Sequence, residues 1–74
     1  GRSKKFETLH ERYGSTREGR DYLKVKEAYD RAGDYYESAA SSFRRGNDLR
    51  GELLMDKAER WNDEADQLAR LLGY

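Results

Sequence analysis

Large and small apolar residues alternate along the middle of the chain and form a stripe. Its large members are Tyr22, Tyr29, Tyr36 and Phe43, and its small members are Val25, Ala32 and Ala39. Each set recurs every seven residues, and the combined steps of three and four place all of them on one side of a helix. The pattern predicts a long helix over residues 16–45, begun by a capping box of Ser15 and Glu18.

Gly33 and Asp34 lie in the middle of this predicted helix. Such a pair often ends one helix and begins the next, so it raises the alternative of two shorter helices. A turn would usually break the phase of the stripe, yet the phase is kept across Gly33. The sequence therefore favours one continuous helix. A glycine inside a helix costs about 1 kcal/mol relative to alanine, and close approach of another helix would explain it.

A second stripe occupies the C-terminal third of the chain. It consists of Leu54, Ala58, Trp61, Ala65, Leu68 and Leu72. The pattern predicts a helix over residues 48–72, capped by Asn47 or Asp48 and ended by Gly73. Because the connection to the preceding helix is only about two or three residues long, the two helices are expected to be antiparallel neighbours.

The two stripes suggest how this hairpin packs. Each has one large and one mostly small column, so the large column of one helix is expected to lie over the small column of the other. Trp61 is then the largest core residue and is expected to lie against Ala32 and Ala39.

A shorter helix is predicted over residues 3–13, with Phe6, Leu9 and Tyr13 on one edge and Gly14 as its stop. A helix of about three turns is marginal alone and must dock on the hairpin. Five apolar residues outside the two seams offer a docking surface or, if left uncovered, a patch for a partner: Leu23, Tyr35, Leu53, Met55 and Leu71. The predicted fold is an all-α three-helix bundle, a single domain spanning residues 1–74.

Composition narrows the functional classes. The chain has 74 residues with no cysteine and no proline, and its 15 basic residues balance its 15 acidic ones. The zero net charge gives no overall attraction to nucleic acid or anionic lipid. No apolar run reaches the roughly 20 residues of a membrane span, and no secretory segment is visible, so an intracellular location is expected.

Catalytic and metal-binding chemistry has little support in the sequence. His10 is the only histidine, and without cysteine no Cys-His or Ser-His pair stands out. The inward Glu-x-x-His pairs of a di-metal bundle are absent as well. The chain is therefore predicted to be non-catalytic, with no cofactor.

An acidic stripe accompanies the last predicted helix. It consists of Glu52, Asp56, Glu59, Asp63 and Asp66, spaced by four and three residues. This stripe is either a solvent-exposed face or a binding surface for a basic peptide or helix. Together with an inter-helix groove near Leu53 and Leu71, it forms the predicted partner-binding surface.

Basic residues form two groups. Arg17, Arg20 and Lys24 begin a stripe on the long helix that continues to Arg31, and Arg44, Arg45 and Arg50 cluster near the second loop. Capping and dipole compensation explain such residues, and so does contact with RNA or a phosphopeptide. The tyrosine column would suit base stacking, although its heptad phase favours a place in the core.

Two families of helical domains resemble parts of the chain. Residues 32–40 look like the turn between paired helices in MIT and TPR-like domains, and residues 55–61 with 66–68 look like the last helix of an MIT domain. This resemblance covers about residues 17–72 and requires a break at Gly33. It implies a three-helix bundle whose grooves take short helical or extended tails from membrane-remodelling assemblies.

The chain also resembles the helical domain that precedes Smr nuclease domains. The matching residues are Tyr36, Ala39, Phe43, Arg44, Arg45, Gly46, Leu54 and Lys57. This resemblance implies an RNA-related partner domain.

The favoured hypothesis is a protein-protein interaction module or adaptor that binds a peptide or helix, and its heptads also allow self-association as a dimer. The alternative is an RNA-binding accessory domain that uses the two basic groups.

Overall fold

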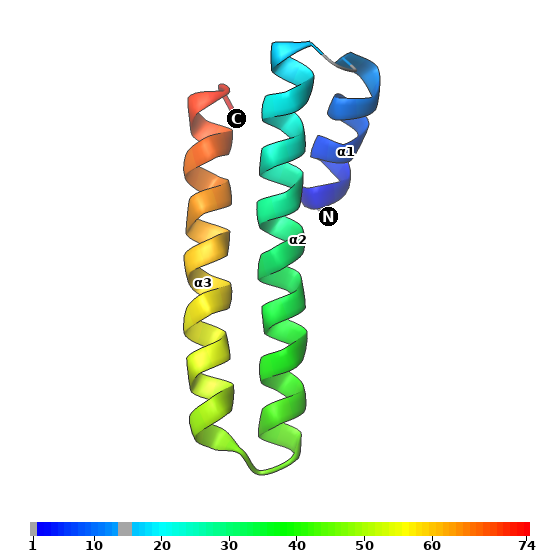
Figure 1. Cartoon of the computed structure of the whole chain (residues 1–74). Coiled ribbons are helices and arrows are strands. Elements are labelled where there is room, and N and C mark those ends of the chain that lie inside the picture. Colours follow the sequence, from blue (N-terminus) through cyan, green and yellow to red (C-terminus); the bar gives the residue numbers. More distant parts are fainter. Residues whose placement is uncertain (1, 14–15) are drawn as a thin grey trace.

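The computed structural model describes residues 2–13 and 16–74 (Figure 1). Within these residues the chain forms three α-helices and no strand: α1 (Arg2–Tyr13), α2 (Arg17–Arg44) and α3 (Asp48–Leu71). The predicted all-α fold with a long antiparallel hairpin is confirmed. The helix α2 runs unbroken through Gly33, as the phase of its stripe predicts.

Local capping explains where the helices begin and end. Thr16 is the N-cap of α2, and its hydroxyl accepts a hydrogen bond from the backbone N–H of Gly19 at 3.2 Å. The predicted roles of Ser15 as a cap and of Gly14 as a stop lie outside the described residues. Asn47 caps α3 by accepting from the N–H of Arg50 at 3.3 Å.

The helices form an elongated molecule of 45 × 19 × 16 Å (Figure 1). The hairpin loop at residues 45–47 turns at Gly46, whose φ of +80° is the left-handed conformation that glycine adopts readily. The helices α2 and α3 lie side by side along their length, and α1 packs against the N-terminal half of α2. The hairpin is therefore longer than the surface that α1 covers.

Small residues form the interface between α2 and α3. The buried residues of α2 beyond its first two turns are Val25, Ala28, Ala32, Ala39 and Ser42, and those of α3 are Gly51, Ala58, Ala65 and Ala69. Side chains of this size let two helices approach closely, so larger residues are displaced to the edges of the seam. Val25 is the largest side chain that is fully buried.

This packing corrects the expected fit of large columns over small ones. Trp61 is only partly buried, so the prediction that it is the largest core residue is wrong. Tyr36 is also only partly buried, and Phe43 is 39% exposed. The physical reason is that small residues of both helices fill the centre of the seam, which leaves no room there for a large ring.

Aromatic residues are buried where α1 docks. Phe6 is 3% exposed and packs its ring against Tyr22 and Tyr29, with centroids 6.2 and 6.1 Å away. Tyr74 closes the cluster at 5.5 Å from Phe6 in an edge-to-face arrangement. The helix α1 leaves Leu53 and Leu71 exposed, whereas Leu23, Tyr35 and Met55 are partly buried.

Replacing Gly33 by alanine is expected to stabilise the protein by up to about 1 kcal/mol, through helix propensity and a less flexible unfolded chain. Gly33 is exposed, and a Cβ atom added there meets no atom within 4 Å, so close helix approach does not explain this glycine. Urea unfolding followed by circular dichroism measures the change.

Gly51 provides the matched control. A Cβ atom added there lies 2.7 Å from the ring of Phe43, which must move. Gly51→Ala is therefore expected to gain less stability than Gly33→Ala, or to lose some. Equal gains at both positions would contradict this account.

Candidate interaction surfaces

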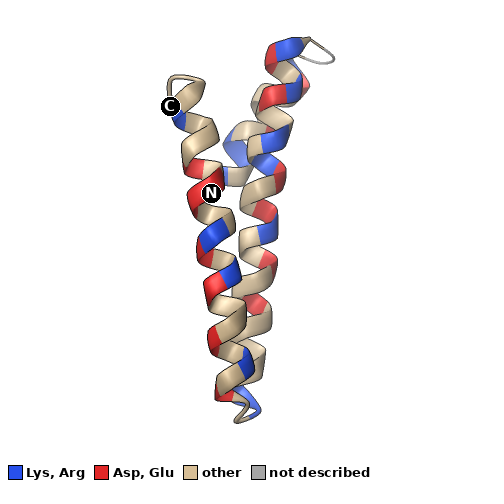
Figure 2. Cartoon of the chain, turned by 60° about the vertical axis from the view of Figure 1, so that its left-hand side comes forward, with Lys and Arg blue, Asp and Glu red and all other residues tan. Residues whose placement is uncertain are grey.

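The five residues of the acidic stripe do not share one environment in the structure. Glu52, Asp56, Glu59 and Asp63 are exposed on α3. Figure 2 shows that acidic and basic residues are both distributed along the hairpin. Asp66 instead faces α1 and α2: its carboxylate pairs with the Arg2 guanidinium at 2.9 Å and accepts a hydrogen bond from the Tyr29 hydroxyl. Asp66 therefore belongs to the contact between the helices, unlike the other four.

The two predicted leucines do not share one groove with the acidic stripe. Leu53 and Leu71 are 59% and 83% exposed. They are 18 residues apart, which is five turns and about 27 Å along the same side of α3. Leu71 lies beside Leu68 and Leu72 at a hollow of about 150 Å³, at the end of α3 remote from Leu53.

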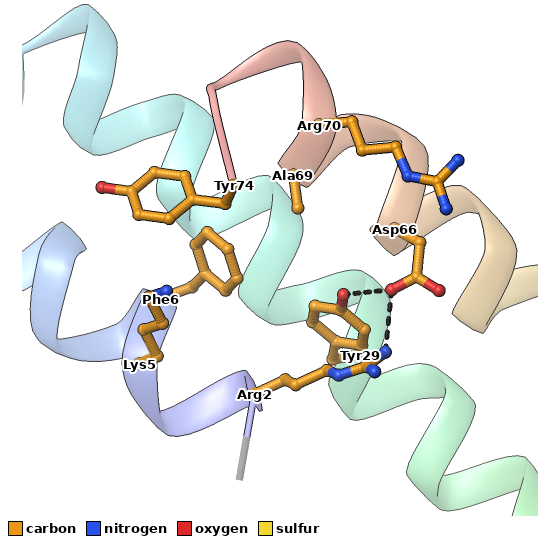
Figure 3. A pocket seen from close by; sticks show the side chains of 8 residues that line it. All are labelled: Arg2, Lys5, Phe6, Tyr29, Asp66, Ala69, Arg70 and Tyr74. Atoms are coloured by element: carbon orange, nitrogen blue, oxygen red, sulfur yellow. Dashed lines mark hydrogen bonds and ion pairs between the residues drawn. The ribbon is translucent and has the colours of Figure 1, made fainter.

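A pocket of about 310 Å³ opens where α1 meets α2 and the C-terminal part of α3 (Figure 3). Three aromatic residues line it, Phe6, Tyr29 and Tyr74, together with Ala69 and four charged residues: Arg2, Lys5, Arg70 and Asp66. The Lys5 ammonium lies over the Tyr74 ring at 4.4 Å from its centroid, in cation–π geometry. We name this cavity the α1 pocket.

Two tyrosine hydroxyls at or beside the α1 pocket have raised pKa values. Burial, followed by the hydrogen bond to Asp66, raises the pKa of Tyr29 above its ordinary value. A hydrogen bond with the Tyr74 hydroxyl at 3.3 Å, followed by burial, raises the pKa of Tyr22 to about 12. Both groups therefore stay protonated at neutral pH and serve as hydrogen-bonding groups.

Two further polar contacts attach α1 to α2. The Ser3 hydroxyl donates to Asp30, and this hydrogen bond, followed by the contact with Lys26, lowers the pKa of that carboxyl. His10 lies with Nδ1 at 2.7 Å from the carbonyl oxygen of Gly19. Because a carbonyl only accepts, Nδ1 carries the proton. These contacts give His10 a structural position.

The two basic groups of the sequence lie far apart. Arg17, Arg20 and Lys24 are exposed near the start of α2, whereas Arg44, Arg45 and Arg50 are exposed around the hairpin loop. Twenty residues of helix separate Lys24 from Arg44, which corresponds to about 30 Å. The fold thus places them on separate surfaces.

A groove follows one edge of the hairpin. Three overlapping hollows of about 440, 290 and 150 Å³ lie along it; the first two share Trp61 and Glu64, and the last two share Lys24 and Leu68. On α3 the groove extends from Lys57 to Leu72, about 22 Å of helix. We name it the Trp61 groove.

The Trp61 groove and α1 use different faces of α2. The groove is lined by Lys24, Ala28 and Arg31, whereas α1 contacts the face that carries Tyr22 and Tyr29. The groove is therefore not covered by α1. Of its lining residues, the sequence predicted Leu71 as partner-binding but not Trp61, because the heptad phase assigned Trp61 to the core.

Cations lie over the two aromatic rings of the groove. The Arg31 guanidinium is 4.8 Å from the centroid of the Trp61 ring, and the Lys57 ammonium is 5.8 Å from that of Tyr35. Such contacts hold partly exposed rings at the surface without burying them.

Residues 2–13 and 16–74 contain no group of three or more side chains placed to hold a metal ion. The same residues include no helix long and apolar enough to cross a bilayer. Comparison of the chain with protein families, with curated proteins and with solved structures found no match.

Proposed function

We propose that the chain is a non-catalytic protein-protein interaction module that binds a helix or peptide of its partner in the Trp61 groove. One observation carries the proposal: the single tryptophan lies on the open edge of the hairpin, outside the seam and away from α1. Tryptophan is among the residues most enriched at energetic centres of protein interfaces.

The dimensions of the groove suit a helical partner. Its length of about 22 Å corresponds to roughly 15 residues of helix, or four turns. Trp61, Leu68 and Leu72 supply an apolar floor along it. Amphipathic helices commonly dock in grooves of this kind through apolar residues on one face.

The helix α1 illustrates the same chemistry within the molecule. It is an amphipathic helix that docks on the hairpin through one central aromatic residue, Phe6, with Leu9 packed beside it. Polar contacts at its edge, such as Arg2 with Asp66, fix its position. A partner helix in the Trp61 groove would combine a buried anchor with peripheral polar contacts in the same way.

The charges of the groove favour a protein over RNA. Four cations and three carboxylates line it: Lys24, Arg31, Lys57 and Arg60, with Asp21, Glu27 and Glu64. These carboxylates repel phosphates, whereas a protein with mixed charges accommodates both signs.

Selection of peptides from a displayed library tests the proposal. Truncating a central anchor of an interface costs about 2 kcal/mol or more. Peptides selected on the native protein are therefore expected to lose at least about thirtyfold in affinity on Trp61→Ala. Leu53→Ala is the matched control, since Leu53 is an exposed apolar residue of α3. It is expected to leave binding unchanged.

Three outcomes would contradict the proposal. The first is that selection yields no peptide, and the second is that the selected peptides bind Trp61→Ala as tightly as the native chain. The third is that the protein binds only single-stranded RNA, at low salt and with steep salt dependence. The last outcome would support the RNA-binding alternative. Sedimentation of the free protein shows whether a second copy occupies the groove instead.

A further inference from the structure

We propose that the α1 pocket is a second binding site, specific for a planar aromatic group that carries a phosphate or carboxylate. The site is distinct from the Trp61 groove. On α3 it uses Asp66, Ala69 and Arg70, whereas the groove uses Trp61 and Leu68, on another side of the same helix.

The charge of the pocket favours an anion. Three cations and one carboxylate line it, an excess of two positive charges: Arg2, Lys5, Arg70 and Asp66. Within the described residues, neither Lys5 nor Arg70 forms an ion pair with a carboxylate. Both cations are therefore available to an incoming anion.

Contacts within the pocket hold two of these cations in place. The Arg2 guanidinium pairs with Asp66 through one nitrogen and lies 5.8 Å from the centroid of the Tyr29 ring. A guanidinium has five N–H donors, so donors remain after this contact. Lys5 lies three residues further along α1, on the same side of the helix, and is held over Tyr74. Part of the ordering cost of binding is thus already met.

The aromatic part of the pocket wall suits a flat ring. Phe6 and Tyr74 meet edge to face at 5.5 Å, with Ala69 and Tyr29 beside them (Figure 3). The volume of about 310 Å³ lies at the small end of ligand pockets. A single ring with one anionic substituent fits this size, and its ring would add to the existing aromatic cluster.

A ligand in this site would also join α1 to α3. Arg2 and Lys5 belong to α1 and Arg70 belongs to α3, and the pocket is bounded by both helices. Any compound that binds the folded protein alone raises its melting temperature with concentration. Binding at the α1 pocket is therefore measurable without knowledge of the natural ligand.

Phenyl phosphate and benzoate are the probes, with phenol, inorganic phosphate and benzylamine as controls. Both aromatic anions are expected to raise the melting temperature and to shift the NMR signals of Phe6 and Tyr74, but not the indole signal of Trp61. Phenol lacks the anionic group and inorganic phosphate lacks the aromatic ring, so each is expected to bind at least about tenfold more weakly. Benzylamine carries the wrong charge and is expected not to bind.

Charge-removing variants assign the site. Lys5→Gln and Arg70→Gln are expected each to weaken phenyl phosphate at least about fivefold, whereas Arg60→Gln, at an exposed cation paired with Asp56, is not. Circular dichroism shows that each variant is folded. The proposal would be overturned if the aromatic anions shifted neither the melting temperature nor the NMR signals, or if phenol bound equally well. It would also be overturned if both pocket variants kept the native affinity, or if the indole signal of Trp61 shifted.

Discussion

Replacing Ala58 by leucine is expected to disrupt the hairpin. Ala58 is fully buried in the seam of small residues, opposite a helix whose facing residues Ala32 and Ala39 are also buried. Three extra carbon atoms fit there only if the helices move apart, and overpacking of this kind costs about 1–3 kcal/mol or more. For a domain of this length, whose total stability is roughly 4–11 kcal/mol, that is a large fraction. Thermal unfolding monitored by circular dichroism measures the loss.

Ala40→Leu is the matched control. Ala40 belongs to the neighbouring helix but is exposed, so the same enlargement is expected to change stability by less than about 0.5 kcal/mol. If Ala58→Leu were as harmless as Ala40→Leu, the close approach of α2 and α3 along their small residues would be wrong.

The sequence predicts the helices better than it predicts the centre of their interface. Periodicity identifies the stripe of α2 and its continuity through Gly33, because a break would shift the phase. Large and small columns lie on the same side of the helix, however, and periodicity alone does not tell which column faces the partner. A second signal was present: Gly51, Ala58 and Ala65 also recur every seven residues, which indicates a seam of small residues.

The candidate sites were less predictable, because they depend on contacts between distant parts of the chain. Asp66 belongs to the same stripe as Asp63 and Glu59, and only the docking of α1 separates it from them. Its partner Arg2 is 64 positions away, a pairing that no local pattern indicates. Trp61 shows the opposite case, since its local pattern indicated a core position that the close helix packing excludes.

Replacing Phe6 by alanine is expected to release α1 while the hairpin persists. Phe6 is 3% exposed, and it is the one α1 residue buried in a cluster completed by Tyr22, Tyr29 and Tyr74. Truncation of a buried phenylalanine costs about 3–5 kcal/mol, more than the remaining edge contacts of a short helix can offset. Val25 and Ala69 of the α2–α3 seam belong to the same cluster as Phe6, but Ala32, Ala39 and Ala58 do not, so the part of the hairpin nearer the loop keeps its own core.

Amide hydrogen exchange distinguishes local from global loss in this variant. Protection is expected to fall throughout α1 but to remain at the seam residues Ala32 and Ala65, because local and global opening have separate free energies. Leu71→Ala is the control, since it removes a large apolar side chain that is 83% exposed and is expected to change exchange nowhere in α1. Equal loss of protection in all three helices would show instead that α1 and the hairpin unfold as one cooperative unit, and that the hairpin depends on the aromatic cluster around Phe6.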